Sequence, residues 1–177
     1  MKKYLFFIAV LFLTAFYANA IIRTVSNSPS TLAQFNTIQA AITASNSGDT
    51  VYVHGSPNAY ASFTLTNKQL VIIGPGWSPN KNLPLGAVVP GCTITGATSA
   101  NTELQGLIFT STININPNHP DNLRFIRNQF FNLSILINEG NVTYSGYLFE
   151  GNLFDNSGWG NSLQYLSKFS FSEQLFF

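Results

Sequence analysis

The stretch "FIRNQF", residues Phe125–Phe130, is matched by a later stretch, "FEGNLF", residues Phe149–Phe154. Both stretches read Phe-x-x-Asn-x-Phe, while the sequence on either side of them is unrelated. A chain that keeps two aromatic residues and one Asn at fixed offsets, and lets the other positions change, has a structural reason for those three positions. The rest of the sequence indicates that this reason is a repeat.

The offsets of these two stretches recur in the second half of the chain. A preceding copy and a following copy align with them: Leu104, Leu107 and Phe109, and Phe171, Gln174 and Phe176. A second series of isoleucines has the same period: Ile94, Ile115 and Ile137. Successive copies follow at a nearly constant interval, and each holds at least two short apolar runs. A period of about 22 residues is typical of a solenoid in which each repeat forms one turn.

Stacking of such turns explains which positions are kept. In a parallel β-solenoid each turn lies about 4.8 Å above the previous one, so equivalent residues are placed directly over one another. Inward positions must then be apolar and similar in size. An Asn at a tight bend can adopt the left-handed conformation, and stacked amides can hydrogen-bond along the column. We therefore expect three columns: Phe125 with Phe149, Phe130 with Phe154, and Asn128 with Asn152.

The predicted fold class is all-β, a right-handed, single-stranded parallel β-helix (solenoid) of about four coils. The alternative is a β-sandwich in which two strands resemble each other by chance. Sandwich strands are separated by turns at less regular intervals and do not normally repeat in two parallel series. The repeat therefore favours the solenoid.

The only clear helical period precedes the repeats. Leu32, Phe35, Ile38 and Ile42 follow one another at helical spacing and would share one face of a helix. Ser30 or Thr31 could cap the N-terminus, and Gly48 follows the end. The pattern predicts a capping helix over residues 31–47 at the N-terminal end of the solenoid.

Residues 1–20 are predicted to form a signal peptide. "MKK" is a positive n-region, an apolar run extends from Tyr4 to Ala18, and the small-x-small site "ANA" ends at Ala20. The run is shorter than the roughly 20 residues that a spanning helix needs, so an uncleaved anchor is the weaker interpretation. We expect a protein that is secreted or on the cell surface of a bacterium. Its mature domain, residues 21–177, has no predicted transmembrane segment.

Charge and metal-ligand composition limit the possible partners. Lys2 and Lys3 leave with the signal peptide, so six of the eight Lys and Arg remain against seven Asp and Glu. No basic field is then available for nucleic acid. Cys92 is the only cysteine, so no internal disulfide is possible despite export. His54 and His119 lie on different predicted coils, which does not indicate a metal site. We expect no cofactor, and stability must come from packing and backbone hydrogen bonds.

Two segments carry a resemblance to a known group of proteins. "IQAAITASNSGDTVYVHG", Ile38–Gly55, and "FTLTNKQLVIIGPGW", Phe63–Trp77, resemble the entry to right-handed parallel β-helix proteins of the pectin-lyase-like superfamily. The likeness is greatest to secreted β-helix repeat proteins of Bacteroidetes-type bacteria and extends from Thr31 to about Asn156. It implies a capping helix, a Gly-Asp-Thr strand and a first coil that ends at a Gly-x-Gly turn. It leaves the activity open, because the superfamily includes lyases, hydrolases and adhesins.

Two regions depart from the repeat. Residues 75–91 are rich in Gly and Pro and are predicted to form a loop insertion. At the C-terminus, "FSFSEQLFF" aligns with "YLFEGNLFD" of the preceding repeat, so the chain stops before the next turn. An open solenoid end exposes unpaired backbone groups, and repeat proteins normally close it with a polar element. We therefore expect an N-terminal fragment of a longer gene product, which self-associates through its open C-terminal coil. The alternative is that this end pairs with another chain.

An enzyme with this fold would need acidic residues gathered on neighbouring coils. A Ca²⁺-dependent lyase needs an acidic cluster and a base, and a hydrolase needs carboxylates about 5 to 9.5 Å apart across one groove. The repeat places Glu150 over Ile126 and Asp155 over Phe131, so neither acid is stacked on another. We therefore assign no catalytic residue.

Four residues are candidate carbohydrate contacts. Trp77 and Tyr60 could form an aromatic platform, because ring faces stack on the C–H faces of sugars. Arg124 and Arg127 could act as a lyase base or bind an anionic sugar, although solvent-facing charges are the stronger interpretation. Trp77 could equally pin its loop to the first coil.

The predicted function is a secreted β-helix module of structural or binding type that contacts polysaccharide. The alternative is the N-terminal part of a polysaccharide lyase or glycoside hydrolase of the pectin-lyase-like superfamily. The sequence that continues beyond Phe177 would distinguish the two, because stacked acids there would favour the enzyme.

Overall fold

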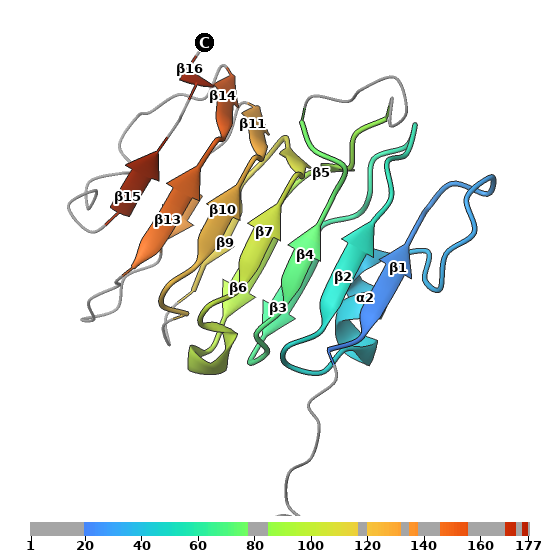
Figure 1. The fold of residues 1–177 in the computed structure, drawn as a ribbon, viewed down its shortest axis with the longest axis horizontal. Coiled ribbons are helices and arrows are strands. Elements are labelled where there is room, and N and C mark those ends of the chain that lie inside the picture. Colours follow the sequence, from blue (N-terminus) through green and yellow to red (C-terminus); the bar gives the residue numbers. More distant parts are fainter. Residues whose placement is uncertain are drawn as a thin grey trace, which may run out of the picture.

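The computed structural model describes residues 20–77, 85–116, 120–131, 135–137, 146–155, 169–172 and 175–176. The strands in these residues pair in parallel and form a β-solenoid of about five turns, one more than predicted. In Figure 1 the chain runs upward along the front, crosses over the top and returns at the back while it advances from right to left. That path is right-handed, as predicted. The predicted signal peptide lies outside the described residues, except for Ala20.

The strands of successive turns form three parallel sheets, which agrees with the prediction of at least two strands in each repeat. The first sheet contains seven strands: β1 (Ile22–Val25), β2 (Thr50–Val53), β4 (Val71–Ile73), β7 (Glu103–Gln105), β10 (Arg124–Ile126), β13 (Tyr147–Glu150) and β15 (Phe169–Ser172). The second contains five: β5 (Val88–Val89), β8 (Ile108–Phe109), β11 (Gln129–Phe131), β14 (Leu153–Asp155) and β16 (Leu175–Phe176). The third contains four: β3 (Phe63–Thr66), β6 (Cys92–Thr95), β9 (Ile113–Ile115) and β12 (Ile135–Ile137).

The register of the strands confirms the predicted columns. Phe125 pairs with Leu104 on one side and Phe149 on the other, and Phe149 pairs in turn with Phe171. In the second sheet the equivalent column is Phe109, Phe130, Phe154 and Phe176. The isoleucine series is confirmed in the third sheet, where Ile115 lies between Ile94 and Ile137.

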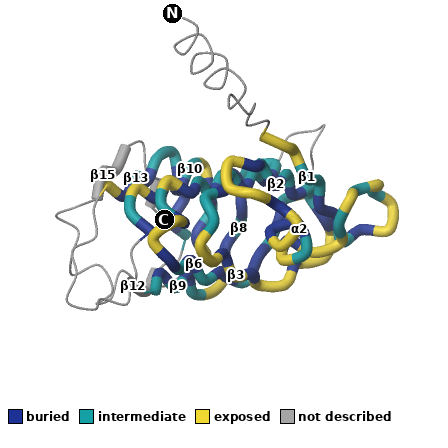
Figure 2. The backbone as a smooth tube through the Cα atoms, turned by 90° about the horizontal axis from the view of Figure 1, so that it is seen from below, coloured by how far each residue is buried: buried dark blue, intermediate teal, exposed yellow. Residues whose placement is uncertain are grey.

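Aromatic stacking fills the interior of the later turns. The Phe125 and Phe149 rings are nearly parallel, with centroids 4.8 Å apart, and those of Phe130 and Phe154 are also 4.8 Å apart. These spacings equal the separation between neighbouring strands, about 4.8 Å, so the rings stack because the backbone does. Figure 2 shows buried positions along the strands, and exposed ones around α2 and in loops near β1 and β2.

The N-terminal helix is shorter than the predicted range of 31–47. Helix α2 spans Ile38–Ala44, because the Thr37 side chain accepts a hydrogen bond from the Ala40 N–H and starts the helix there. Ile38, Ala41 and Ile42 face the core, whereas Leu32 is almost fully exposed.

Phe35, which we expected on the helix face, instead belongs to the edge of the first sheet. Its N–H donates to the Thr24 carbonyl at 3.0 Å, and its carbonyl accepts from the Ser26 N–H at 2.9 Å. The side chain of Gln39 in α2 likewise bonds both the N–H and the carbonyl of Thr64, at the edge of β3. The N-terminal cap therefore has two parts. The segment at Phe35 covers the edge of the first sheet, and helix α2 covers the edge of the third sheet.

The predicted loop insertion of residues 75–91 contains a strand. Val88 and Val89 form β5, paired with Ile108 and Phe109 of β8, and Val89 is fully buried together with Ala87. Gly and Pro residues flank the two valines on both sides, so the sequence pattern did not indicate a strand there. The departure from the repeat is therefore shorter than predicted, and the second sheet begins inside it.

Candidate functional site

The acidic side chains of the described residues are dispersed. Asp49 is buried near the start of the first sheet, 3.6 Å from the Nε of Arg23. Glu103 pairs with Arg124 at 3.0 Å across neighbouring strands of the same sheet. Within the described ranges, no group of three or more His, Cys, Asp or Glu side chains is arranged to hold a metal ion.

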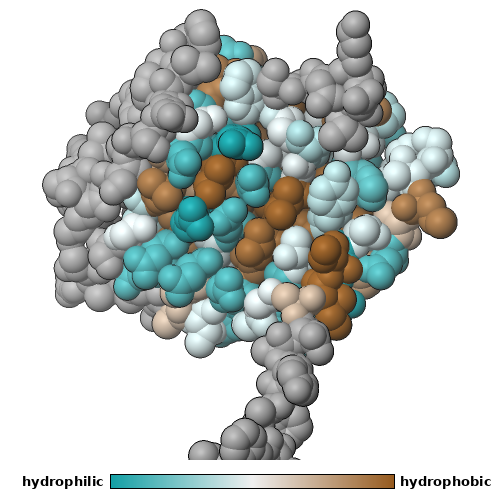
Figure 3. All heavy atoms as spheres, viewed as in Figure 1, coloured by the Kyte–Doolittle hydropathy of each residue, from teal (hydrophilic) through white to brown (hydrophobic). Residues whose placement is uncertain are grey.

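The outer face of the first sheet has no uniform chemical character (Figure 3). Arg124 and Glu103 share a row with Val71. In the next outward row, Ile126 lies between Gln105 and Glu150. Such a surface does not indicate a ligand.

The corner between the first and second sheets is built from residues with positive φ. Gly106, Arg127 and Gly151 have φ values of 65°, 51° and 60° on three successive turns. We expected the left-handed conformation at Asn128 and Asn152, but it occurs at the residue before each of them. Gly adopts this conformation without strain, whereas a residue with a Cβ atom does so at a cost of about 1 to 2 kcal/mol. Arg127 is therefore the strained member of the column.

The Asn residues that follow are buried and connect the turns. Both side chains are fully buried. The Oδ1 of Asn128 accepts from the Leu107 N–H at 2.9 Å, and its Nδ2 donates to the Leu104 carbonyl at 2.8 Å. One turn later, Asn152 accepts from the Asn128 N–H at 2.9 Å and donates to the Phe125 carbonyl at 2.9 Å. This geometry makes the amide column structural.

A pocket of about 360 Å³ opens over this corner, lined by Pro75, Gly76, Trp77, Arg127 and Gly151. The indole Nε1–H of Trp77 donates to the Gly151 carbonyl at 3.4 Å, although the two residues are 74 positions apart. Trp77 thus reaches the turn that contains β13, and not only the first coil as one interpretation supposed. Arg127 is exposed, and its Cγ lies 3.4 Å from where a Cβ on Gly151 would be placed. A Cβ at Gly151 would thus make ordinary van der Waals contact with the Arg127 stem, and it is the positive φ that favours Gly at this position.

The structure brings together two of the four predicted contacts. Trp77 and Arg127 line the corner pocket, while Arg124 is engaged with Glu103 on the first sheet. Tyr60 is buried, with its hydroxyl donating to the His54 carbonyl at 2.7 Å, and burial raises its pKa. Its ring is therefore not available to stack on a sugar.

Sequence reasoning did not identify the glycines of this pocket. Gly76 has a φ of 106°, and the Gly106 carbonyl accepts a hydrogen bond from its N–H at 2.9 Å. A signal for them was present, because "GPGW" precedes the departure from the repeat and a Gly precedes Asn152. Their contact depends on how the loop after β4 folds back, which a repeat pattern does not specify.

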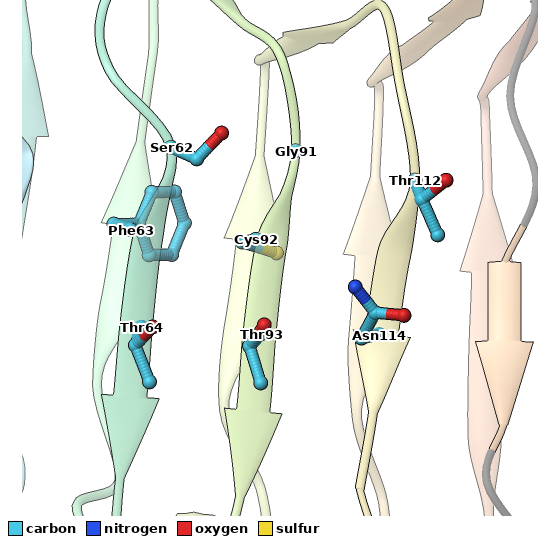
Figure 4. A pocket seen from close by; sticks show the side chains of 8 residues that line it. All are labelled: Ser62, Phe63, Thr64, Gly91, Cys92, Thr93, Thr112 and Asn114. Carbon is cyan, nitrogen blue, oxygen red and sulfur yellow. The ribbon is translucent and has the colours of Figure 1, made fainter.

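A second, smaller hollow lies on the outer face of the third sheet (Figure 4). Its volume is about 150 Å³. The residues that line it are neutral: Ser62, Phe63, Thr64, Gly91, Cys92, Thr93, Thr112 and Asn114. The register places Thr64, Thr93 and Asn114 side by side on successive strands. A Cβ on Gly91 would overlap the Thr112 carbonyl oxygen, so the hollow requires Gly there.

Comparison of the chain with protein-family models, with curated proteins and with solved structures finds no match. Within the described residues, no helix has the length and apolar character needed to cross a membrane.

Proposed function

We propose that this protein is an exported β-solenoid module of binding type that contacts carbohydrate at the corner pocket. The observation that carries the proposal is the meeting of Trp77 and Arg127, which lie far apart in the sequence, in one pocket. An aromatic face and a guanidinium are complementary to the two parts of an acidic sugar, its C–H face and its carboxylate. The segments that resemble the pectin-lyase-like superfamily support the same substrate class.

Both side chains are available to a ligand. The indole is fixed by its bond to the Gly151 carbonyl, so its orientation does not have to be ordered on binding. Arg127 takes no part in the Arg23–Asp49 or the Arg124–Glu103 ion pair, so its guanidinium need not leave either of these acids to bind a ligand. The described residues that line the pocket include no acid, and this supports a binding role.

Calorimetric titration with oligogalacturonate tests the proposal, with neutral cello-oligosaccharide as the comparison ligand. Loss of a stacking face or of a charge-assisted hydrogen bond should weaken binding about tenfold, so we expect this effect from both Trp77→Ala and Arg127→Gly. The Arg127→Gly change suits the backbone, because φ is positive at this position.

Arg124→Gly is the matched control, because it removes a nearby arginine that does not line the pocket. It should leave the affinity for oligogalacturonate unchanged. Equal affinity in the parent and in both pocket variants would overturn the assignment. Equal affinity of the parent for the acidic and neutral oligosaccharides would refute the role of Arg127 in binding the sugar carboxylate.

A further inference from the structure

A buried carboxylate lies beside the backbone nitrogen at which the signal peptide is predicted to end. Asp49 is 2% exposed, and its Oδ1 accepts a hydrogen bond from the Ile21 N–H at 2.9 Å. Its Oδ2 accepts from the Asn46 N–H at 2.9 Å. Ile21 directly follows Ala20, the last residue of the "ANA" cleavage site.

The nitrogen of Ile21 is held in place by bonds that do not involve the leader. The Ile21 carbonyl accepts from the Thr50 N–H at 2.9 Å, and β1 then pairs with β2 from Ile22 onward. The Asp49 carbonyl accepts from the Val71 N–H at 3.2 Å, which fixes the backbone of Asp49 to the next turn. Removal of the residues before Ile21 would leave all of these contacts intact.

We propose that cleavage after Ala20 creates a buried-carboxylate ion pair, between the new α-ammonium of Ile21 and Asp49, that completes the first turn of the solenoid. In the cleavage step a peptidase adds water across the Ala20–Ile21 amide. The C–N bond breaks, Ala20 gains the carboxylate, and the Ile21 nitrogen gains the protons that make it an ammonium. The inference rests on the predicted signal peptide.

The charges around Asp49 favour this pair. Burial alone would raise the pKa of Asp49, but the hydrogen bonds from Ile21 and Asn46 and the nearby Arg23 together hold its pKa below the ordinary value. The carboxylate is therefore ionised at neutral pH. Arg23 approaches Oδ2 and Ile21 approaches Oδ1, so the two cations occupy different oxygens of one carboxylate. Ile21 is 46% exposed, which reduces the repulsion between the cations by solvation.

The pair should change stability in a direction that depends on pH. A charge-assisted hydrogen bond is roughly twice as strong as a neutral one. The mature chain should therefore have a larger free energy of unfolding than a chain that keeps a neutral N–H at Ile21. The carboxylate holds the proton on the ammonium, so the α-amino pKa is raised in the folded state. The gain is then fully present below the α-amino pKa of the unfolded chain, and it is lost as pH rises through the folded value.

The test compares two chains that differ only in whether Ala20 is present at the N-terminus. One begins at Ile21 and the other at Ala20, each released from the same fusion by a protease that leaves none of its own residues. Both are also made with Asp49→Asn. Urea unfolding is measured from pH 6 to pH 10, and the α-amino group is labelled with an acylating reagent in the folded protein.

We expect the chain that begins at Ile21 to have an unfolding constant at pH 6 about three- to tenfold smaller. The difference should disappear at high pH and in the Asp49→Asn pair, and labelling should be slower at Ile21 than at Ala20. If Asp49→Asn does not fold, the pH profile and the labelling rates decide alone. An equal unfolding constant at every pH would overturn the ion pair. A mass of the exported protein that places its N-terminus elsewhere would instead overturn the predicted cleavage site.

Discussion

Removal of the Asn128 side chain should be among the most damaging single changes to this fold. In Asn128→Ala the Leu107 N–H and the Leu104 carbonyl both lose their side-chain partner inside a fully buried corner. A buried group left without a partner costs about 1 to 3 kcal/mol, so two such groups should lower the free energy of unfolding by about 2 to 6 kcal/mol. That loss is a large share of the roughly 5 to 15 kcal/mol that stabilises a typical domain.

Asn114→Ala is the matched control, because Asn114 faces outward on the third sheet and lines the smaller hollow. A surface substitution of this kind should change the free energy of unfolding by less than about 0.5 kcal/mol. Equilibrium urea unfolding of the parent and both variants, followed by far-ultraviolet circular dichroism, gives the two values. Equal losses would refute the hydrogen-bonded amide column, and a small loss for both would show that solvent reaches the corner.

Three further predictions concern the backbone and one buried acid. Arg127→Gly should be about 1 kcal/mol more stable than Arg127→Ala in urea unfolding, because only Gly adopts the φ of 51° without strain. Gly106→Ala should lower the free energy of unfolding more than Gly48→Ala does, because a Cβ at Gly106 would lie 2.7 Å from the Gly74 carbonyl oxygen and one at Gly48 meets no atom within 4 Å. Equal losses in urea unfolding would show that the backbone near Gly106 shifts freely. The pKa of Asp49 is depressed by folding, so its stabilisation should be present above its ordinary pKa of 3.8 and lost as pH falls below it; Asp49→Asn should flatten this part of a pH-dependent unfolding curve.

The columns of the repeat could be predicted because inward positions leave a regular trace in the sequence. Phe125 and Phe149 recur at the interval of one turn, and the register of the strands follows the same interval. The third sheet was only partly visible, since its isoleucine series gave one position in each turn. Parallel stacking thus explains why the fold class was correct.

Other features depend on single contacts and leave no periodic pattern in the sequence. The helix begins at Ile38 because Thr37 caps it, although the apolar spacing also fits residues further toward the N-terminus. The contact between Trp77 and Gly151 depends on one loop, and nothing in the composition marks Arg127 as the residue with positive φ between two glycines. For this reason the sequence contained both halves of the candidate site but did not place them together.

The amide column has a direction, and this has a consequence for synthesis on the ribosome. Asn128 satisfies backbone groups of the preceding turn, and Asn152 does the same for the turn that contains Asn128. The chain is synthesised from its N-terminus. The Leu107 N–H therefore has no side-chain partner until Asn128, 21 positions later, has been added. Each new turn completes the buried hydrogen bonds of the turn before it. The last turn synthesised should therefore remain less stable until the next one has formed.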